Sequence, residues 1–321
     1  MRDQSRFVSP VGHVLILLCG LAMAACGHAR EESNRGQGQE QAAASGVYSH
    51  RLSVAGMERD YLLFVPARRN PGQTMPLVIV LHGGGARAER MLAVGMNDIA
   101  QANGFMVAYP DGIGRGNKHS WNAGSPVPQG YAEEVRVDDV GFVSRMIDDI
   151  ASKQRLDTRR VYVTGASKGG MLAYRLACEL SERIKAIAPV AASMVVPECR
   201  PSRPVAVFHV HGSADQNVPL RGGRGDYTGP TANYPAVSEV IEKWRQINQC
   251  QPQPKQEKIS SASCSRYERC RADVALCVIE GSGHGWPGVQ TERQKRRGGI
   301  DLNFQTSAEV WRFFSNQSVR P

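Results

Sequence analysis

The residues Gly165-Ala166-Ser167-Lys168-Gly169 follow the apolar run 161–164 and precede a segment with helical spacing, 170–177. A strand, a Gly-x-Ser-x-Gly turn and a helix in this order are the setting of a nucleophile elbow, whose tight turn strains the serine backbone and lifts its hydroxyl above the sheet. Glycines on both sides let the strand and the helix pack closely. The same pattern also occurs in glycine-rich turns without catalytic function, so the rest of the chain has to decide between the two interpretations.

Apolar runs alternate with helical spacing over most of the chain. Segments of helical spacing lie around 91–99, 140–150, 237–244 and 307–314. The segments that indicate strands are 47–54, 61–65, 77–81, 105–109, 161–164, 186–190, 205–210 and 274–279. The first two predict an antiparallel pair at a sheet edge. The alternation as a whole predicts an α/β fold with a mostly parallel central sheet covered by helices on both faces.

The N-terminal segment differs from the rest of the chain. Residues 1–25 combine early arginines, an apolar stretch and small residues directly before Cys26. This order predicts a secretory signal peptide, and the cysteine after small residues resembles the lipobox of bacterial lipoproteins. We therefore expect lipidation of Cys26, with plain secretion after nearby cleavage as the alternative. Residues 26–45 offer almost nothing to bury and predict a flexible tether, followed by one domain over 46–316 and a tail over 317–321.

The chain has 321 residues, 41% of them apolar, and a formal charge of +9. An excess of positive charge can indicate nucleic-acid or anionic-surface binding. The basic residues are scattered along the sequence, apart from 293–297, and no nucleic-acid-binding module is visible. The sequence therefore predicts a solvated basic surface and no nucleic-acid partner.

Six cysteines remain after the two of the N-terminal segment are set aside. An even number in an exported chain predicts three disulfides. One pair would join the end of the helix after the elbow to the segment after the next strand, and two would lie in a hairpin-like stretch. The favoured pairs are Cys178 with Cys199, Cys250 with Cys270 and Cys264 with Cys277. A zinc site is the alternative, but no Cys-x-x-Cys or His-x-x-x-His spacing supports it, and no metal is predicted.

A serine hydroxyl becomes an effective nucleophile when a base takes its proton and a third group orients that base. Asp215 directly follows the strand-like run 205–210, and His284 follows 274–279 within a glycine-rich loop. Side chains beyond the carboxyl ends of parallel strands converge on one crevice. The order Ser167, Asp215, His284 is that of the α/β-hydrolase triad, with Asp226 as the rival acid.

Other histidines and paired carboxylates have simpler interpretations. His209 and His211 are expected to pack or to hydrogen-bond at a strand end. Asp138 and Asp139 precede a helical segment and are expected to cap it.

Ester attack also builds negative charge on the carbonyl oxygen, which requires backbone donors already in place. The stretch Leu81-His82-Gly83-Gly84-Gly85 follows an early strand, in the position of the His-Gly-Gly-Gly motif of lipases and esterases. The amide of Lys168 is one expected donor of the oxyanion hole, and either Gly84 or Gly85 is the other. A phosphate-binding loop is the alternative, but the Lys and Ser/Thr of such a loop do not follow.

The chain resembles the polyhydroxybutyrate depolymerase and feruloyl esterase family of α/β-hydrolases, the carbohydrate esterase family 1 type, and especially its small bacterial lipoprotein members. The stretches that carry the resemblance, besides the elbow and the glycine loop, are Tyr109-Pro110-Asp111-Gly112, Ser120-Trp121-Asn122-Ala123-Gly124, Val137-Asp138-Asp139-Val140-Gly141-Phe142, Val218-Pro219 after Asp215, and Gly283-His284-Gly285-Trp286-Pro287-Gly288. The resemblance implies the triad named above. It also implies that Trp121 and Trp286 border the acyl or alcohol pocket.

Two features depart from the family pattern. Lys168 stands where Asn, Gln or Ala is expected, so its cation either favours acidic substrates or turns outward. No polymer-binding domain follows the closing helical segment, which argues against attack on solid polyester.

We therefore expect an exported, cofactor-free serine esterase in the periplasm or outside the cell, tethered to the envelope membrane by lipid on Cys26. Its expected substrates are short or aromatic esters, such as hydroxyalkanoate oligomers, feruloyl esters or acetylated sugars. No protein partner is implied. The rival interpretations are a peptidase of the prolyl-oligopeptidase type and a non-catalytic envelope lipoprotein that binds ligands.

Overall fold

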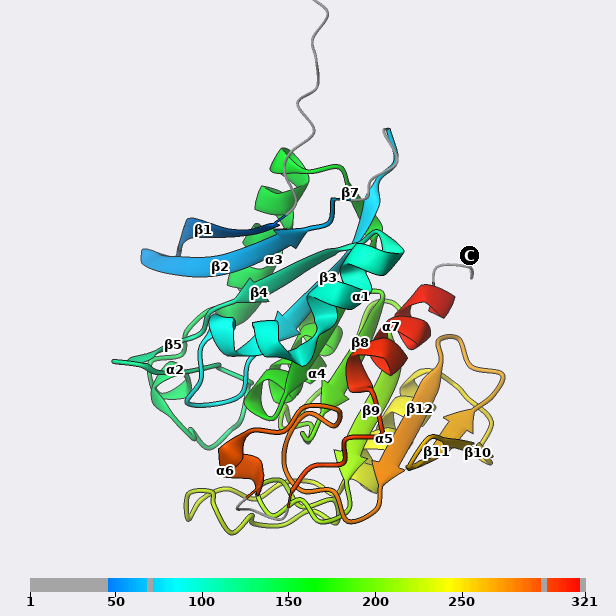
Figure 1. Cartoon of the computed structure of the whole chain (residues 1–321). Helices are drawn as coiled ribbons and strands as arrows, with labels where there is room; N and C mark the ends of the chain where they lie inside the picture. The colour runs from blue at the N-terminus through cyan, green and yellow to red at the C-terminus, as the bar shows by residue number, and fades with distance from the viewer. Residues whose placement is uncertain (1–45, 68–71, 296–298, 318–321) are drawn as a thin grey trace, which may run out of the picture. The chain divides into compact units, whose positions relative to one another are not determined.

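A ten-stranded sheet organises the computed structural model of this chain, which describes residues 46–67, 72–295 and 299–317 (Figure 1). The expected signal peptide, Cys26, the tether before Gly46 and residues 318–321 lie outside the described residues. The described residues form one compact unit. No helix within the described ranges is long and apolar enough to span a bilayer.

The strand order of the sheet is β1-β2-β4-β3-β7-β8-β9-β12-β11-β10. Its strands are β1 (Gly46–Val54), β2 (Met57–Val65), β3 (Met75–Leu81), β4 (Met106–Pro110), β7 (Leu156–Ala166), β8 (Ala186–Val190), β9 (Ala206–Gly212), β10 (Lys255–Ile259), β11 (Ala262–Tyr267) and β12 (Val274–Ile279). The six strands from β4 to β12 in this order run parallel, and antiparallel strands flank them on both sides. A separate hairpin pairs β5 (Ile113–Arg115) with β6 (Lys118–Ser120).

Helices cover both faces of the sheet, as the sequence predicts. Alternate residues of a strand point to opposite faces, so Leu77, Ile79 and Leu81 belong to one apolar core, whereas Val78 and Val80 belong to another. The first core packs against α3 (Asp139–Lys153), α4 (Lys168–Glu179) and α5 (Val237–Ile247). The second packs against the 3₁₀ helix η1 (Ala88–Val94), α1 (Met96–Asn103) and α7 (Thr306–Asn316). Two short helices, α2 (Tyr131–Glu134) and α6 (Glu292–Lys295), lie in loops.

The helical segment expected around 91–99 is two elements. Gly95 adopts φ 77° and ends η1 while it precedes α1. This left-handed conformation is accessible to glycine at little cost and interrupts helical hydrogen bonding. The apolar spacing is thus shared by two short helices that pack on the same face.

The structure contains the three disulfides that the sequence predicts: Cys178–Cys199, Cys250–Cys270 and Cys264–Cys277. Cys264 and Cys277 stand opposite each other on β11 and β12. Each bridge closes a loop of 13 to 21 residues and contributes about 2–4 kcal/mol by restricting the unfolded chain.

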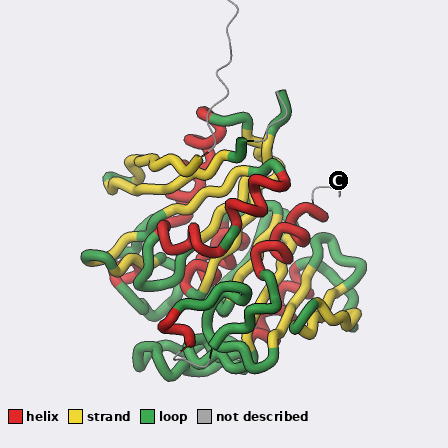
Figure 2. The backbone as a smooth tube through the Cα atoms, viewed as in Figure 1, coloured by secondary structure: helices red, strands yellow, loops and turns green. Residues whose placement is uncertain are grey.

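The parallel strands define two edges of the sheet that are used throughout. At the carboxyl edge these strands end, and the long loops after β9 and β12 gather there (Figure 2). At the amino edge the same strands begin. Because β1 is antiparallel to β2 and β2 is antiparallel to β4, Gly46 also lies at the amino edge.

Candidate active site

Ser167 lies in the turn between β7 and α4 with φ 54° and ψ −120°. This is a left-handed conformation that a residue with a side chain adopts only when its surroundings impose it. The Ser167 N–H donates to Val190 O at 2.9 Å. A Cβ on Gly165 would stand 2.7 Å from Leu81 Cβ, and one on Gly169 would collide with Leu81 O. The two glycines therefore allow β3, β7 and α4 to approach closely, and the strained serine stands at the carboxyl edge.

Asp215 and His284 meet beyond the ends of two neighbouring strands. Asp215 follows β9 and His284 follows β12. The His284 Nδ1–H donates to Asp215 Oδ2 at 2.8 Å, while Asp215 Oδ1 accepts from the amides of Asn217 and Val218 at 2.8 and 2.9 Å. The rival acid Asp226 makes no such contact with His284. With its proton on Nδ1, the imidazole presents Nε2 as a proton acceptor.

The Asp215 carboxylate is held ionised although it is buried. Burial by itself would raise the pKa of Asp215, but the hydrogen bonds that its carboxylate accepts from His211 and His284 lower it well below its ordinary value. An ionised, oriented carboxylate is the group that stabilises a neighbouring imidazolium.

A buried hydrogen-bond chain supports the loop that carries Asp215. The His211 ring donates from Nε2 to Val218 O at 2.8 Å and lies 3.4 Å from Asp215 Oδ2. Its Nδ1 therefore accepts from His209 Nε2 at 2.9 Å, and His209 Nδ1 accepts from the Tyr174 hydroxyl at 2.6 Å. Burial also lowers the pKa of His209, which keeps this ring neutral. The two histidines thus hydrogen-bond at the strand end, as the sequence predicts.

Ser167 and His284 line one cavity of about 290 Å³ at the carboxyl edge. Within the described ranges no hydrogen bond joins Ser167 to His284, and such contacts commonly tighten only when substrate binds. The apolar part of the lining includes Met91, Ala93, Val94, Trp286 and Val289, and the polar part includes Arg90, Gln216, Asn217, Thr291 and Gln294.

The glycine loop after β3 contributes Gly83 and Gly84 to the lining of this cavity. The Gly85 N–H donates to His119 O at 2.7 Å and is therefore engaged. Gly84 lines the cavity, and an added Cβ there would stand 3.6 Å from Lys168 Cβ. Across the part of the chain that the structure describes, no acceptor is found for the N–H of Gly84 or of Lys168. Of the two glycines, only Gly84 therefore has an N–H without an acceptor among the described residues.

Trp121 does not border the cavity, contrary to what the resemblance implies. Its side chain is fully buried in the core that contains α3 and α4. The indole N–H donates to His82 O at 2.8 Å and the ring packs on the His82 ring, with centroids 4.6 Å apart. Trp121 therefore contacts the glycine loop from the core side and holds His82 in place. Trp286, in contrast, lines the cavity, as expected.

Lys168 adopts neither orientation that the sequence suggested. Its ammonium is buried and lies 2.6 Å from Glu133 Oε1, so it points neither at substrate nor at solvent. Burial lowers the pKa of Lys168, and the Glu133 carboxylate opposes that shift. Glu133 also accepts from the amides of Ala123 and Gln129. The pair ties the start of α4, beside the serine, to the segment 121–134.

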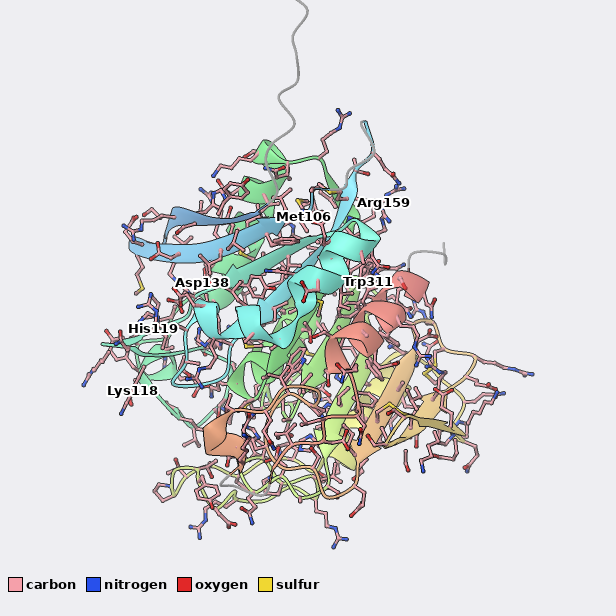
Figure 3. The ribbon with its side chains drawn as sticks, viewed as in Figure 1. Met106, Lys118, His119, Asp138, Arg159 and Trp311 are labelled. Carbon is pink, nitrogen blue, oxygen red and sulfur yellow. A yellow bond between two sulfur atoms is a disulfide. The ribbon has the colours of Figure 1, made fainter. Side chains whose placement is uncertain are left out.

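Only the first of the paired carboxylates caps α3. Asp138, labelled in Figure 3, accepts from Gly141 N at 2.8 Å as the N-cap. Asp139 instead lies fully buried 2.6 Å from Arg59 Nη2 and accepts from Asn122 N. Burial raises the pKa of Asp139, against the opposing charge of Arg59. This second buried pair joins β2 to the segment that contains Trp121.

Within the described ranges no cluster of three or more histidine, cysteine, aspartate or glutamate side chains could hold a metal ion.

Comparison with known proteins identifies the family. A family model described as "Esterase PHB depolymerase" matches residues 59–241, which include Ser167 and Asp215. The chain belongs to this esterase family. It is a carboxylic ester hydrolase of the serine hydrolase fold. This finding argues against the two rival interpretations of the sequence, a peptidase and a non-catalytic lipoprotein.

Two relatives of known name are similar to this chain in sequence. The putative esterase NocK of Nocardia uniformis subsp. tsuyamanensis is 34% identical over 264 residues, which cover 75% of this chain and 74% of the relative. Feruloyl esterase B of Piromyces equi is 31% identical over 57% of this chain, but the match covers only 34% of that longer protein.

Solved structures support the α/β-hydrolase fold. An acetyl xylan esterase from Aspergillus awamori aligns with a TM-score of 0.55 at 16% identity and covers 78% of this chain and 97% of its own. A thermostable esterase aligns with a TM-score of 0.51 at 18% identity and covers 85% of this chain and 60% of its own.

Proposed function

We propose that this esterase uses Ser167 as nucleophile, His284 as base and then acid, and Asp215 as the group that orients His284. The observation that carries the proposal is the His284–Asp215 hydrogen bond of 2.8 Å on the wall of the cavity that Ser167 also lines. A serine on a strained turn, a histidine with Nε2 unprotonated and a buried carboxylate are the parts that nucleophilic ester cleavage requires.

In the first half of the reaction, His284 Nε2 takes the Ser167 proton as Oγ attacks the ester carbonyl carbon. The carbonyl oxygen becomes an oxyanion, to which the amides of Gly84 and Lys168 donate. Collapse of the tetrahedral intermediate breaks the bond to the alcohol oxygen, and His284 returns the proton to the departing alcohol. Water then attacks the acyl-serine by the same route, with His284 as base, and releases the acid.

The proposed substrates are short-chain or aromatic carboxylic esters, such as hydroxyalkanoate oligomers, feruloyl esters or acetylated sugars. The cavity of about 290 Å³ supports this size class, since a cavity of roughly 150 Å³ already holds a benzene ring. Met91, Val94 and Trp286 offer an apolar wall for the acyl or aromatic group. Relatives with feruloyl esterase and acetylxylan esterase in their names support the same classes.

We also propose that the protein is exported, as residues 1–25 predict, and anchored by lipid on Cys26. The three disulfides of the domain support an oxidising compartment.

Mass spectrometry of the acyl-enzyme tests the mechanism and the substrate class together. We expect brief mixing with feruloyl, acetyl and hydroxybutyryl p-nitrophenyl esters to add one acyl group to the Ser167 peptide. The relative turnover of the three esters then identifies the preferred acyl group. Ser167→Ala should acquire no acyl group. Acylation of another residue, or turnover that survives Ser167→Ala, would contradict the proposal.

A further inference from the structure

A second, larger concavity lies at the amino edge, opposite the candidate active site. It has a volume of about 1110 Å³ and is formed where β7, β8, β9 and β12 begin. We call it the amino-edge cleft. Six cations line it: Arg159, Arg160, Arg183, Lys185, Arg203 and Arg271. Only two carboxylates, Asp157 and Glu182, line it with them.

The pairing of these charges leaves positive charge unbalanced. Arg159 and Arg160 share Asp157, at 3.4 and 2.8 Å. Arg203 pairs with Glu182, and Arg183 pairs with Asp148 outside the cleft. For Lys185 and Arg271 no ion-pair partner is found within the described ranges. The lining of the cleft therefore carries more positive than negative charge, and ion pairs do not neutralise all of its cations.

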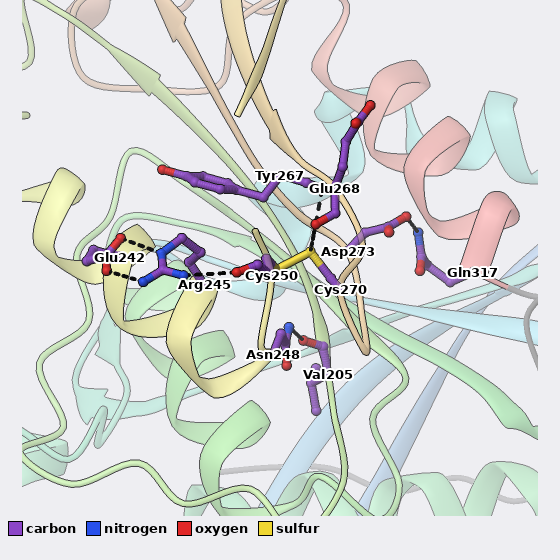
Figure 4. Close-up of a disulfide and its surroundings, with 10 residues drawn as sticks. All are labelled: Val205, Glu242, Arg245, Asn248, Cys250, Tyr267, Glu268, Cys270, Asp273 and Gln317. Atoms are coloured by element: carbon purple, nitrogen blue, oxygen red, sulfur yellow. Dashed lines mark hydrogen bonds and ion pairs between the residues drawn. A yellow bond between two sulfur atoms is a disulfide. The ribbon is translucent and has the colours of Figure 1, made fainter. Parts of the chain in front are cut away.

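The two unpaired cations come from well-fixed backbone. Lys185 donates its N–H to Val161 O and accepts from Ala206 N, between three adjacent strands. Arg271 follows Cys270, whose disulfide to Cys250 is shown in Figure 4. The Arg271 N–H also donates to Asn248 O at 2.8 Å. Fixed backbone lowers the entropy lost when these side chains bind an anion.

The position of the cleft indicates its occupant. The chain enters the domain at Gly46, which lies at the same amino edge, four strands away from β7. Neighbouring strands are about 4.8 Å apart, so this entry point is roughly 20 Å from the cleft. Cys26 precedes Gly46 by 20 residues, which span at most about 70 Å when extended. A lipid on Cys26 would therefore hold the amino edge within reach of the membrane.

We propose that the amino-edge cleft binds the phosphate groups of anionic phospholipids and seats the domain on the membrane surface. Arginine guanidinium groups suit phosphate oxygens because their paired N–H donors match them in geometry. Cations close to an anionic bilayer are attracted to it, and the attraction grows with their number. Seated in this way, the protein presents Ser167 away from the bilayer, because β7 separates the two edges by roughly 30 Å. The proposal does not depend on the reaction mechanism given above.

Vesicle co-sedimentation of the chain from residue 26 onward, without the expected signal peptide and with Cys26→Ala to remove the acylation site, tests the cleft alone. Vesicles of phosphatidylcholine with about one third phosphatidylglycerol should bind this protein, and pure phosphatidylcholine should not. Adding Lys185→Glu and Arg271→Glu should weaken binding at least about tenfold. High salt should abolish binding, since the interaction is electrostatic.

The matched control reverses two exposed cations of the carboxyl edge, Lys118→Glu and Arg224→Glu, and leaves the amino-edge cleft intact. Figure 3 labels Lys118 on the β5–β6 hairpin, far from Arg159 at the amino edge. This control should retain most vesicle binding, and all variants should retain hydrolysis of p-nitrophenyl acetate. Equal losses in both pairs of variants would assign binding to net charge and overturn the proposal. So would absence of binding, or equally tight binding of inorganic phosphate in solution, which would assign the cleft to a free anion.

Discussion

Charged side chains at the two edges of the sheet differ in burial and in pairing. At the carboxyl edge the charged side chains next to Ser167 and His284 are closely paired, as in the buried pair Lys168–Glu133 and in His284 with the buried Asp215. At the amino edge the cations are exposed or half-buried and outnumber the carboxylates that line the same cleft. Buried pairs hold geometry because a lost partner leaves an uncompensated charge. Exposed cations keep their attraction for an external anion. The comparison indicates chemistry at one edge and surface binding at the other.

The largest expected effect separates the edges by activity. Ser167→Ala should lower kcat for p-nitrophenyl acetate on the order of a millionfold, and Asp215→Asn about ten-thousandfold. Arg271→Ala, at the amino edge, should leave kcat within about twofold. A loss at Arg271 comparable with that at Asp215 would break the comparison.

The next prediction concerns stability. Glu133→Gln leaves the buried Lys168 ammonium without its counter-charge and should lower the free energy of unfolding by about 3–5 kcal/mol. The amino-edge pair Arg203–Glu182 is exposed, so Arg203→Met should lower it by less than about 1 kcal/mol. Urea unfolding measures both, and the double variant Glu133→Leu with Lys168→Met should recover part of the loss. Equal costs for the two single changes would show that burial does not distinguish the edges.

A smaller effect distinguishes the two tryptophans at the carboxyl edge. Trp121→Phe removes the hydrogen bond to His82 O and should cost about 1 kcal/mol of stability while leaving KM unchanged. Trp286→Phe reshapes the cavity wall and should change KM for aromatic esters up to about tenfold. Steady-state kinetics on phenyl and acetyl esters measures KM for both variants. A KM change for Trp121→Phe as large as that for Trp286→Phe would indicate that Trp121 contributes to the substrate pocket.

The smallest effect is expected for acid stability. The folded-state pKa of Asp215 lies below its unfolded value, so its contribution is present above the unfolded pKa, about 3.9, and is lost as pH falls through the folded pKa. Asp215→Asn should therefore flatten the fall in stability below about pH 4. Unfolding curves collected between neutral and acidic pH measure this, and an unchanged slope would contradict it.

Much of the carboxyl edge could be predicted because its signals are local in the sequence. Unbroken apolar runs predict strands buried on both faces, and the residues directly after β3, β7, β9 and β12 are the ones that meet there. The three disulfide pairs favoured from the sequence are also confirmed, although the order of elements left other pairings open. The carboxyl ends of the strands in a parallel sheet lie at one edge, so the position of a residue after a strand was enough to predict that it lies there.

The rest depends on contacts without local pattern. Glu133 lies 35 residues from Lys168 in a short helix with no apolar period to mark its inward face. Trp121 stands in a loop sequence that fits a pocket wall as well as a core. The amino-edge cleft collects cations from four separate strand starts, so a sequence in which basic residues look scattered produces one concentrated surface. Only the assembled sheet brings these residues together.

Fluorophosphonate labelling followed by peptide mapping tests the assignment of Ser167 most directly. The probe should add one phosphonyl group per chain, on the Ser167 peptide, and abolish ester hydrolysis in proportion to labelling. Asp215→Asn should label much more slowly and Ser167→Ala not at all. A fully active protein that takes up no label, or one labelled at another residue, would contradict the account.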